Sequence, residues 1–281
     1  IITVTTLALA LFSGPVLAEW KPNGSITMMT MFPPGGGGAA MAKILKTAPA
    51  DGMTIGFAVS ETFSFAPAMN PKIGYTADDF SFIGAVANTQ VGWVAAADSP
   101  YNSLEDLVAA AKDGAEIEVG VFSPRANAAV RAIGKHFGVE FIPVPIKSGN
   151  EGINNILNGH LDTTLVGGPQ APHVRKGALK VLASLEAERL IVGKNALTLI
   201  ESGAPVATFR VKWTLAAPAG MPEDILKAWT AALESSMTNE TLRAFITEKM
   251  SLKMNFTPGD LLKDEIVKGR GASEALIGFL R

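Results

Sequence analysis

The sequence VPIKSGNEGINNILNGHLD, residues Val144–Asp162, holds the pattern that decides the fold. An apolar strand end leads into the polar turn Lys147–Asn150, and apolar residues then recur at the spacing of one helix face. Asn150 is expected to cap this helix, and Gly159 lies where a helix typically ends. A further strand follows, so the stretch predicts a strand–helix–strand unit of an α/β protein.

The turn in this stretch is also a candidate anion site. Backbone N–H groups at the first turn of a helix attract negative charge, and Lys147 adds a positive charge beside them. Lys147, Ser148 and Gly149 are therefore candidate ligand-binding residues. An ordinary connection with a solvated lysine would have the same pattern, so the turn alone leaves both interpretations open.

Strand and helix patterns alternate along the rest of the chain, which favours an α/β architecture with parallel sheets. The expected strands are Ser25–Phe32, Met53–Val59, Glu116–Phe122, Phe141–Pro145, Leu161–Val166, Leu179–Ser184 and Val211–Ala217. The expected helices are Ala39–Lys46, Leu104–Lys112, Ala126–Phe137, a short turn or helix at Pro172–Gly177, Glu223–Met237 with Pro222 at its first position, and a last helix capped by Thr257–Asp260 that reaches about Lys268.

The composition limits the classes of protein to consider. The chain has 281 residues, of which 48% are hydrophobic and 18% charged, as in compact α/β proteins with room for two domains. Its net charge of −2 and the lack of a basic run make nucleic acid an unexpected partner. Because cysteine is absent, the sequence has no disulfide framework, thiol nucleophile or cysteine-bound zinc site.

The first eighteen residues have the pattern of a signal peptide. Thr5–Phe12 is a short apolar core, Gly14 and Pro15 follow it, and small or aliphatic residues at Val16 and Ala18 precede Glu19. We therefore expect export with cleavage after Ala18. A buried first strand or helix is the alternative interpretation of this segment.

Further short motifs follow one another along the chain. They are Phe32–Gly36, Ala48–Thr54, Asp78–Ile83, Ser99–Leu107, Trp213 and Ala217–Pro222. Together with Val144–Asp162, this ordered set resembles the tripartite tricarboxylate transporter receptors, periplasmic solute-binding proteins that are also called Bug receptors. The resemblance covers nearly everything after residue 25.

The resemblance implies both a fold and a function. The fold would be α/β and periplasmic-binding-protein-like, with a ligand cleft between two lobes, one formed by residues 19–115 plus 215–281 and the other by 116–214. The function would be that of a periplasmic receptor that captures a small organic carboxylate by hinge closure and docks on membrane transporter subunits. Such a receptor is expected to be a monomer and to need no cofactor.

The expected ligand-binding residues lie in loops at the carboxyl ends of strands, where ligand sites of parallel sheets are found. Arg125 is unusual for the family, whose members have small residues there, and it would either pair with a ligand carboxylate or be a solvated residue at a helix start. Glu61 would repel an anion, so we expect it to point away or to meet an amino group. The full set is Phe32, Pro34, Gly35, Gly36, Ser60, Thr62, Ser123, Arg125, Asn127, Lys147, Ser148, Gly149, Gly168 and Gln170.

One part of the chain departs from the family pattern. In the family a helix and a strand separate two glycine-rich loops, whereas here Gly35–Gly38 leads straight into Ala39–Lys46. The family's acidic residue after the first loop also has no counterpart. We therefore expect the first lobe to be less stable, and its half of the ligand site to be altered.

The sequence contains no recognisable catalytic or metal-binding motif. The histidines His136, His160 and His173 lack metal-ligand spacing, and neither a G-x-S-x-G elbow nor an H-E-x-x-H helix occurs. A binding protein rather than an enzyme is therefore expected. A secreted α/β enzyme acting on a small acid, or a ligand-sensing subunit for a membrane kinase, are the alternatives.

Overall fold

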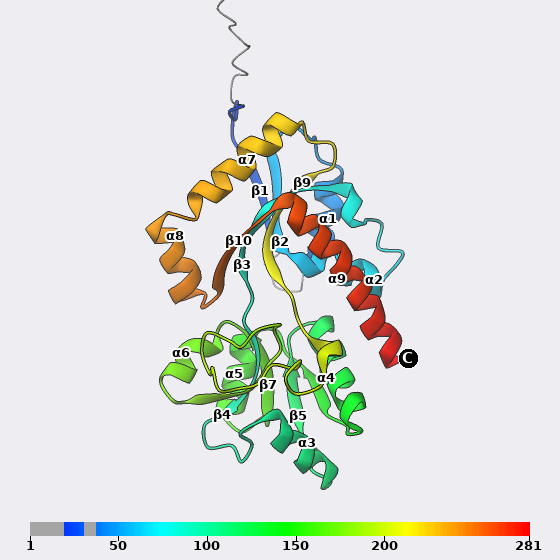
Figure 1. Ribbon diagram of the computed structural model, residues 1–281, viewed down its shortest axis with the longest axis vertical. Helices are drawn as coiled ribbons and strands as arrows, with labels where there is room; N and C mark the ends of the chain where they lie inside the picture. The colour runs from blue at the N-terminus through cyan, green and yellow to red at the C-terminus, as the bar shows by residue number, and fades with distance from the viewer. Residues whose placement is uncertain (1–19, 31–37) are drawn as a thin grey trace, which may run out of the picture.

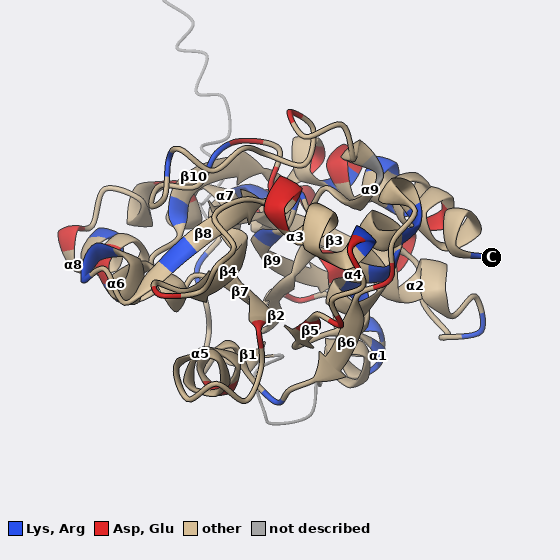
Figure 2. Cartoon of the chain, turned by 90° about the horizontal axis from the view of Figure 1, so that it is seen from below, with Lys and Arg blue, Asp and Glu red and all other residues tan. Residues whose placement is uncertain are grey.

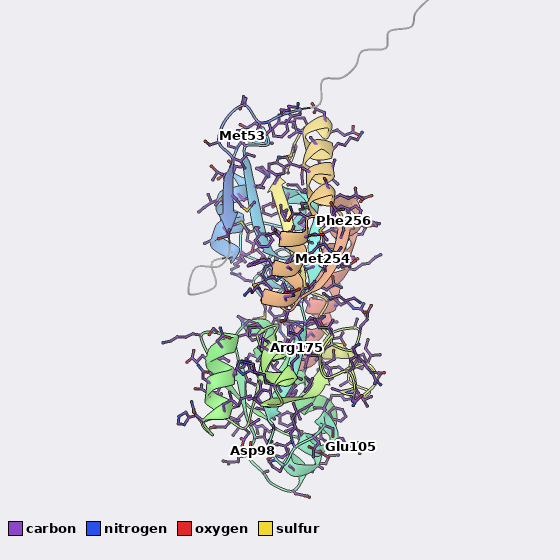
Figure 3. All side chains as sticks on the ribbon, turned by 90° about the vertical axis from the view of Figure 1, so that its left-hand side faces the viewer. Met53, Asp98, Glu105, Arg175, Met254 and Phe256 are labelled. Atoms are coloured by element: carbon purple, nitrogen blue, oxygen red, sulfur yellow. The ribbon has the colours of Figure 1, made fainter. Side chains whose placement is uncertain are left out.

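The computed structural model describes residues 20–30 and 38–281, which form two lobes along the long axis of the molecule (Figure 1). Each lobe is built on one five-stranded sheet. Apolar side chains fill both faces of each sheet, because each sheet is covered by helices on its two sides. Met53 lies towards one end of the molecule, whereas Asp98 and Glu105 lie at the opposite end, in the second lobe (Figure 3).

The first lobe contains the sheet with strand order β1-β2-β9-β3-β10. Helices α1, α2 and α9 cover one face, and α7 and α8 cover the other. The strands are β1 Thr27–Thr30, β2 Thr54–Val59, β9 Lys212–Pro218, β3 Phe80–Asn88 and β10 Lys253–Pro258. The helices and turns are α1 Gly38–Lys46, η1 Ser60–Thr62, α2 Phe65–Met69, η2 Ala77–Asp79, α7 Glu223–Ser236, α8 Glu240–Ala244, η4 Phe245–Lys249 and α9 Gly259–Leu280.

The second lobe contains the sheet with strand order β6-β5-β7-β4-β8. Helices α3 and α4 pack on one face of this sheet, and α5 and α6 on the other. The strands are β4 Val91–Ala96, β5 Glu118–Val121, β6 Ile142–Pro145, β7 Thr163–Gly167 and β8 Leu179–Ser184. The helices are α3 Leu104–Lys112, α4 Pro124–Phe137, α5 Gly149–Leu157, α6 Gln170–Arg175 and the short η3 Pro205–Ala207.

The chain crosses between the lobes at two adjacent points, and α9 adds a third connection. The first crossing lies between β3 and β4, and the second lies just before β9; the Thr89 N–H donates to Val211 O across them at 2.9 Å. Near its C-terminal end, α9 packs on the second lobe, where Leu276 is fully buried in the same apolar cluster as α4. Lys135 Nζ donates to Phe279 O at 2.6 Å and holds this end in place.

Most of the expected helices and strands are confirmed within a few residues, but the sheets are mixed rather than parallel. β9 runs antiparallel to both of its neighbours, β2 and β3, and β4 runs antiparallel to β7 and β8. The strands β3, β4 and β10 were not expected. The last helix does not end near Lys268, because Ser273 and Leu276 are buried farther along it and extend it to Leu280.

The sequence-based cap of α5 is also corrected. Ser148, not Asn150, is the N-cap, since its hydroxyl accepts the Glu151 N–H at 3.2 Å. The Glu151 carboxylate in turn accepts the Lys147 N–H at 2.7 Å, so the two side chains satisfy the helix start reciprocally. Pro222 is likewise the residue before α7 and not its first position.

The chain changes sheet earlier than the expected boundary at residue 115. β4 pairs with β7 and β8 of the second sheet, so the first change falls between Asn88 and Val91. The return falls between Phe209, which is bridged to Glu186, and Lys212, which begins β9. The crossing residues have no glycine- or proline-rich composition, so the sequence does not mark these points.

Two expected features lie outside the described residues. These are the signal peptide, residues 1–18, and the loop that contains Phe32, Pro34, Gly35 and Gly36. Among residues 20–30 and 38–281, no helix combines the length and the hydrophobicity needed to cross a bilayer. Basic and acidic residues are interspersed along the ribbon in the view of Figure 2.

Candidate functional site

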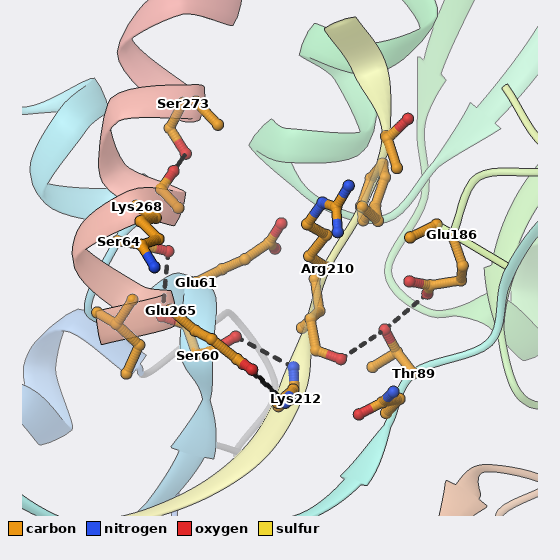
Figure 4. Close-up of a pocket in the computed structure, with 18 of the residues that line it drawn as sticks. Ser60, Glu61, Ser64, Thr89, Glu186, Arg210, Lys212, Glu265, Lys268 and Ser273 are labelled. Carbon is orange, nitrogen blue, oxygen red and sulfur yellow. Dashed lines mark hydrogen bonds and ion pairs between the residues drawn. The ribbon is translucent and has the colours of Figure 1, made fainter. Parts of the chain in front are cut away.

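A cavity of about 700 Å³ lies where the two lobes meet, and its size suits a small organic ligand (Figure 4). The first lobe contributes the η1 turn that follows β2 and one side of α9. The second lobe contributes the start of α4 and the segment after β8. Both crossing segments, Thr89–Gln90 and Arg210–Val211, line it as well and are together called the hinge below, so the cavity is bordered by both lobes and by the hinge.

Arg125 is the central cation of this cavity. It lies in the first turn of α4, a helix that begins at Pro124 and is capped by Ser123, whose hydroxyl accepts the Ala126 N–H at 3.1 Å. The residue is only 6% exposed, and its guanidinium lies 5.4 Å from the Phe65 ring centroid and 5.0 Å from that of Phe209. Two aromatic faces therefore fix the plane of the guanidinium while leaving its edges free for polar contacts.

The donors of Arg125 are only partly used within the described part of the chain. Nη2 donates to Thr208 O at 2.8 Å, and Nε lies 3.4 Å from Glu61 Oε1, an ion-pair distance without hydrogen-bond geometry. Nη1 has no hydrogen-bond partner there, and neither has the buried Thr208 hydroxyl. Unsatisfied buried donors are costly, so this corner of the cavity is prepared for an acceptor.

Two of the acidic side chains that line the cavity act electrostatically on Arg125. They are Glu61, from η1, and Glu186, from the segment after β8, and they extend into it from opposite sides (Figure 4). Burial raises the pKa of Glu61 to about 7, against the opposing attraction of Arg125, although the side chain keeps 21% exposure. Burial also raises the pKa of Glu186 to about 8, so at neutral pH its carboxyl group is mostly protonated.

Glu186 is held in place by the hinge. Its Oε1 accepts the Thr89 hydroxyl at 2.8 Å and the Val91 N–H at 2.9 Å. Thr89 and Val91 flank the first crossing, so the position of Glu186 depends on the geometry of that crossing. These bonds favour the ionised carboxylate, but desolvation outweighs them.

The other charged side chains of the cavity are more exposed or form ion pairs. Lys212 Nζ lies 2.7 Å from Glu265 Oε2, and Lys253 of β10 pairs with Glu188 across the two lobes. Arg210 and Lys268 complete the charged lining. The cavity thus carries both signs of charge, and Arg125 is its most deeply buried cation.

Of the predicted site residues, Ser60 and Arg125 line the cavity. Ser60 Oγ accepts the Lys212 N–H at 3.1 Å, which joins η1 to β9. The buried Thr62 lies outside the lining, and its carbonyl accepts the Tyr75 hydroxyl at 2.9 Å. For Arg125, the solvated interpretation is wrong, and Glu61 meets a guanidinium rather than pointing away.

The remaining predicted residues that the structure describes do not line this cavity. Ser123 and Ser148 are helix caps, and Lys147 is exposed. Asn127 lines a separate pocket of about 540 Å³ beside the C-terminal end of α9. The others make packing contacts or contacts with the hinge. Gly149 lies beside Val166, Gly168 lies beside Met250, and Gln170 donates a hydrogen bond to Gln90.

Gly168 and Gln170 have clear structural roles. A Cβ on Gly168, whose φ is +127°, would lie 2.6 Å from Met250 O of the other lobe, so only glycine permits this close approach. Gln170 is fully buried; its Nε2 donates to Gln90 O at 2.6 Å and its Oε1 accepts the Gly168 N–H at 2.7 Å. Both residues therefore support the hinge rather than the cavity lining.

Sequence reasoning missed Glu186 and Thr208 as cavity residues. The only local signal for Glu186 was its position two residues after an expected apolar strand, Leu179–Ser184. Thr208 lies in a stretch for which no element was expected. Within the described ranges there is no group of three or more His, Cys, Asp or Glu side chains that could hold a metal ion.

The sequence of the chain is similar to a known protein family and to known proteins. The family model described as tripartite tricarboxylate transporter family receptor matches residues 27–259. A Cupriavidus necator protein, the UPF0065 protein in gbd 5'region, is 25% identical over 224 residues, which are 76% of this chain and 67% of that protein.

Solved structures share the fold. A TctC solute binding protein from Polaromonas is 21% identical, with a TM-score of 0.73 over 92% of this chain and 99% of that one. MatC from Rhodopseudomonas palustris with bound malate is 18% identical, with a TM-score of 0.72 over 92% of this chain and 100% of that one. The family model covers most of the chain, and on that basis the chain belongs to the tripartite tricarboxylate transporter receptor family.

Proposed function

We propose that the protein is a periplasmic receptor that captures a small organic carboxylate in the cavity between its lobes. One observation carries this proposal: Arg125 lines that cavity and is buried, and among the described residues neither its Nη1 nor the Thr208 hydroxyl has a hydrogen-bond partner. A carboxylate has two oxygens that accept from a guanidinium and a hydroxyl at once. Membership of a receptor family and the likeness to a structure that holds malate support the same ligand class.

The expected affinity is in the micromolar range, so that the ligand can be released again. Each charge-assisted hydrogen bond contributes about 1.5–3 kcal/mol, and a micromolar Kd corresponds to about −8 kcal/mol. A few bonds to one or two carboxylate groups therefore suffice, even after the cost of immobilising the ligand.

Ligand capture is proposed to favour closure of the two lobes. Glu61 belongs to the first lobe and Arg125 to the second, and their 3.4 Å ion pair already joins the two lobes, so a ligand that contacts residues of both lobes would stabilise this close arrangement. A ligand that binds the closed arrangement more tightly shifts the population towards it. The closed receptor would then dock on membrane transporter subunits, after export directed by residues 1–18.

Calorimetric titration with malate, succinate, adipate and citrate tests the binding proposal. At least one acid is expected to bind, and the fully methylated ester of the same acid is expected not to bind, because it lacks the charged oxygens. Nuclear magnetic resonance of the recovered acid is expected to show it unchanged. Binding of no acid, or its chemical conversion at a substantial rate, would contradict the proposal.

Arg125→Gln tests the site within this experiment. The variant is expected to lose about 2–5 kcal/mol of binding free energy, as when one partner of a buried charged hydrogen bond is removed. The matched control is Arg131→Gln on the same helix, since Arg131 is exposed and lines the other pocket. Loss of binding in the control but not in Arg125→Gln would indicate that the ligand binds in that other pocket, and it would refute the assignment of the ligand site to the cavity lined by Arg125.

A further inference from the structure

The cavity holds more acidic groups at its centre than a site for an anion should. Glu61 and Glu186 line it with Arg125; Arg125 and Glu61 act electrostatically on Glu186, and both carboxyl groups act on Arg125. If both carboxyl groups were ionised, the buried trio would have a net negative charge. A carboxylate arriving at Arg125 would then meet uncompensated like charges in a poorly solvated space, which is strongly unfavourable.

Protonation of Glu186 removes this conflict and supplies a donor. Both described hydrogen bonds to its carboxyl group end on Oε1, so Oε2 is the oxygen available to carry a proton. A protonated carboxyl group donates one hydrogen bond, and the ligand class proposed above consists of acceptors. The same group when ionised can only accept, so it would repel the ligand.

We infer that Glu186 is a specificity-determining residue whose carboxyl group donates a hydrogen bond to an anionic oxygen of the ligand, so that the receptor binds a carboxylate together with one proton. This inference rests on the proposed function, because it requires a carboxylate in the same cavity. The raised pKa of Glu186, about 8, supports it, since the proton is already present at neutral pH. Ligand binding in this form breaks no covalent bond of the ligand or of Glu186. Above about pH 8, where Glu186 is mostly ionised, the proton that Glu186 takes up on binding comes from solvent.

The surroundings of Glu186 determine how it responds to pH. Glu61 from η1 and Arg125 from α4 face it within the cavity, and Thr89 and Val91 hold its other oxygen. Glu61 titrates at a lower pH, since its pKa is raised only to about 7. The remaining charged groups of the lining are Arg210, Lys268 and the ion pairs Lys212–Glu265 and Lys253–Glu188.

The test is the pH dependence of binding, measured by calorimetry with malate, succinate and adipate from about pH 6 to about pH 9.5. For the wild type, the affinity is expected to fall by about tenfold per pH unit above about pH 8, where Glu186 must take up a proton to bind the acid. Titrations in two buffers of different ionisation enthalpy are expected to show uptake of about one proton in that range. Affinity that is constant with pH, or that rises, would overturn the inference.

Three variants separate Glu186 from the other groups. Glu186→Gln keeps an acceptor for Thr89 and Val91 and a permanent donor, so the steep fall above about pH 8 is expected to disappear. Glu61→Gln is expected to retain that fall. Glu105→Gln makes the same chemical change on exposed α3, at the far end of the second lobe (Figure 3), and is expected to retain both affinity and slope.

The outcomes distinguish the two proposals. If no acid binds at any pH, the proposed function fails and this inference falls with it. If an acid binds but Glu186→Gln keeps the wild-type slope, only the inference fails. A purely structural role for Glu186 would change the melting temperature of the variant without changing the slope of affinity with pH, and that result would also overturn the inference.

Discussion

Gly259 begins α9 directly against the backbone of β3. A Cβ at this position would lie 1.8 Å from Phe82 O, and backbone cannot move aside as a flexible side chain can. We therefore predict that Gly259→Ala displaces the start of α9 and lowers the free energy of unfolding by at least about 2 kcal/mol. Denaturant unfolding monitored by circular dichroism measures this change.

Gly271→Ala is the matched control for that substitution. Gly271 lies within the same helix, and a Cβ there meets nothing within 4 Å. Because alanine favours a helix more than glycine does, this variant is expected to gain about 0.5–1 kcal/mol. Equal effects of the two substitutions would mean that the contact with Phe82 does not constrain the helix.

The buried carboxyl groups also predict how stability depends on pH. The pKa of Glu61 is raised to about 7 and that of Glu186 to about 8, from an ordinary value of 4.5, so the folded state binds protons that the unfolded state releases. Their stabilising effect is fully present below about pH 4.5 and is lost as the pH rises through about 7 and 8. On the scale of about 1.4 kcal/mol per pKa unit, the two groups together correspond to a loss on the order of 8 kcal/mol.

Thermal unfolding of the ligand-free protein between about pH 5 and about pH 9 measures this effect. The melting temperature is expected to decline across that range, and Glu186→Gln is expected to reduce the decline. A melting temperature that rises steadily from about pH 5 to about pH 8 would contradict the assignment of raised pKa values.

At the scale of residues, the sequence predicted part of the site. Ser60 and Arg125 were found because a loop after a strand carries its polar groups to the edge of a sheet. Glu186 and Thr208 were not found, because their approach to Arg125 depends on the folded path of the second lobe. Arg125 was a candidate from the sequence and lines the cavity, but its burial between Phe65 and Phe209 could not be predicted from neighbours in sequence.

Among the elements, α5 offers a test of local sequence rules. Ser148 caps it by accepting the Glu151 N–H, whereas Asn150 lies one residue inside the helix start. Ser148→Ala is expected to cost about 1 kcal/mol of stability, and Asn150→Ala to change it by less than about 0.5 kcal/mol. Chemical denaturation of both variants measures the difference, and a larger loss for Asn150→Ala would show that the cap is assigned to the wrong residue.

Helices and strands with strong local signals were predicted more reliably than those fixed by packing. The helix α3, whose N-cap Ser103 accepts the Asp106 N–H at 3.1 Å, and the strand β8 both have the predicted bounds. The end of α9 was missed because Gly269 and Gly271 weaken the helical pattern while buried contacts farther along extend it. Strand direction was missed for a related reason, since β9 pairs with strands that are distant in sequence.

For the whole molecule, α9 is the element that joins the stability of the two lobes. It starts on the first sheet, yet Leu276 is fully buried in the second lobe's core. Leu276→Ala is therefore expected to cost about 2–5 kcal/mol and to reduce hydrogen-exchange protection in α4 of the other lobe. The control is Leu261→Ala on the same helix, which is 55% exposed and should change stability by less than about 0.5 kcal/mol. Unchanged protection of α4 in the first variant would contradict this role.

The position of β9 has a consequence for how the protein is made. β9 is the middle strand of the first sheet, but the chain reaches it only after all five strands of the second sheet have been synthesised. The second lobe can therefore complete its sheet on a nascent or translocating chain. Until β9 is synthesised, the edges of β2 and β3 that pair with it remain unpaired. The lobe whose chain is synthesised first is thus expected to complete its sheet last. Chains interrupted before Pro218 have unpaired strand edges, which favour aggregation.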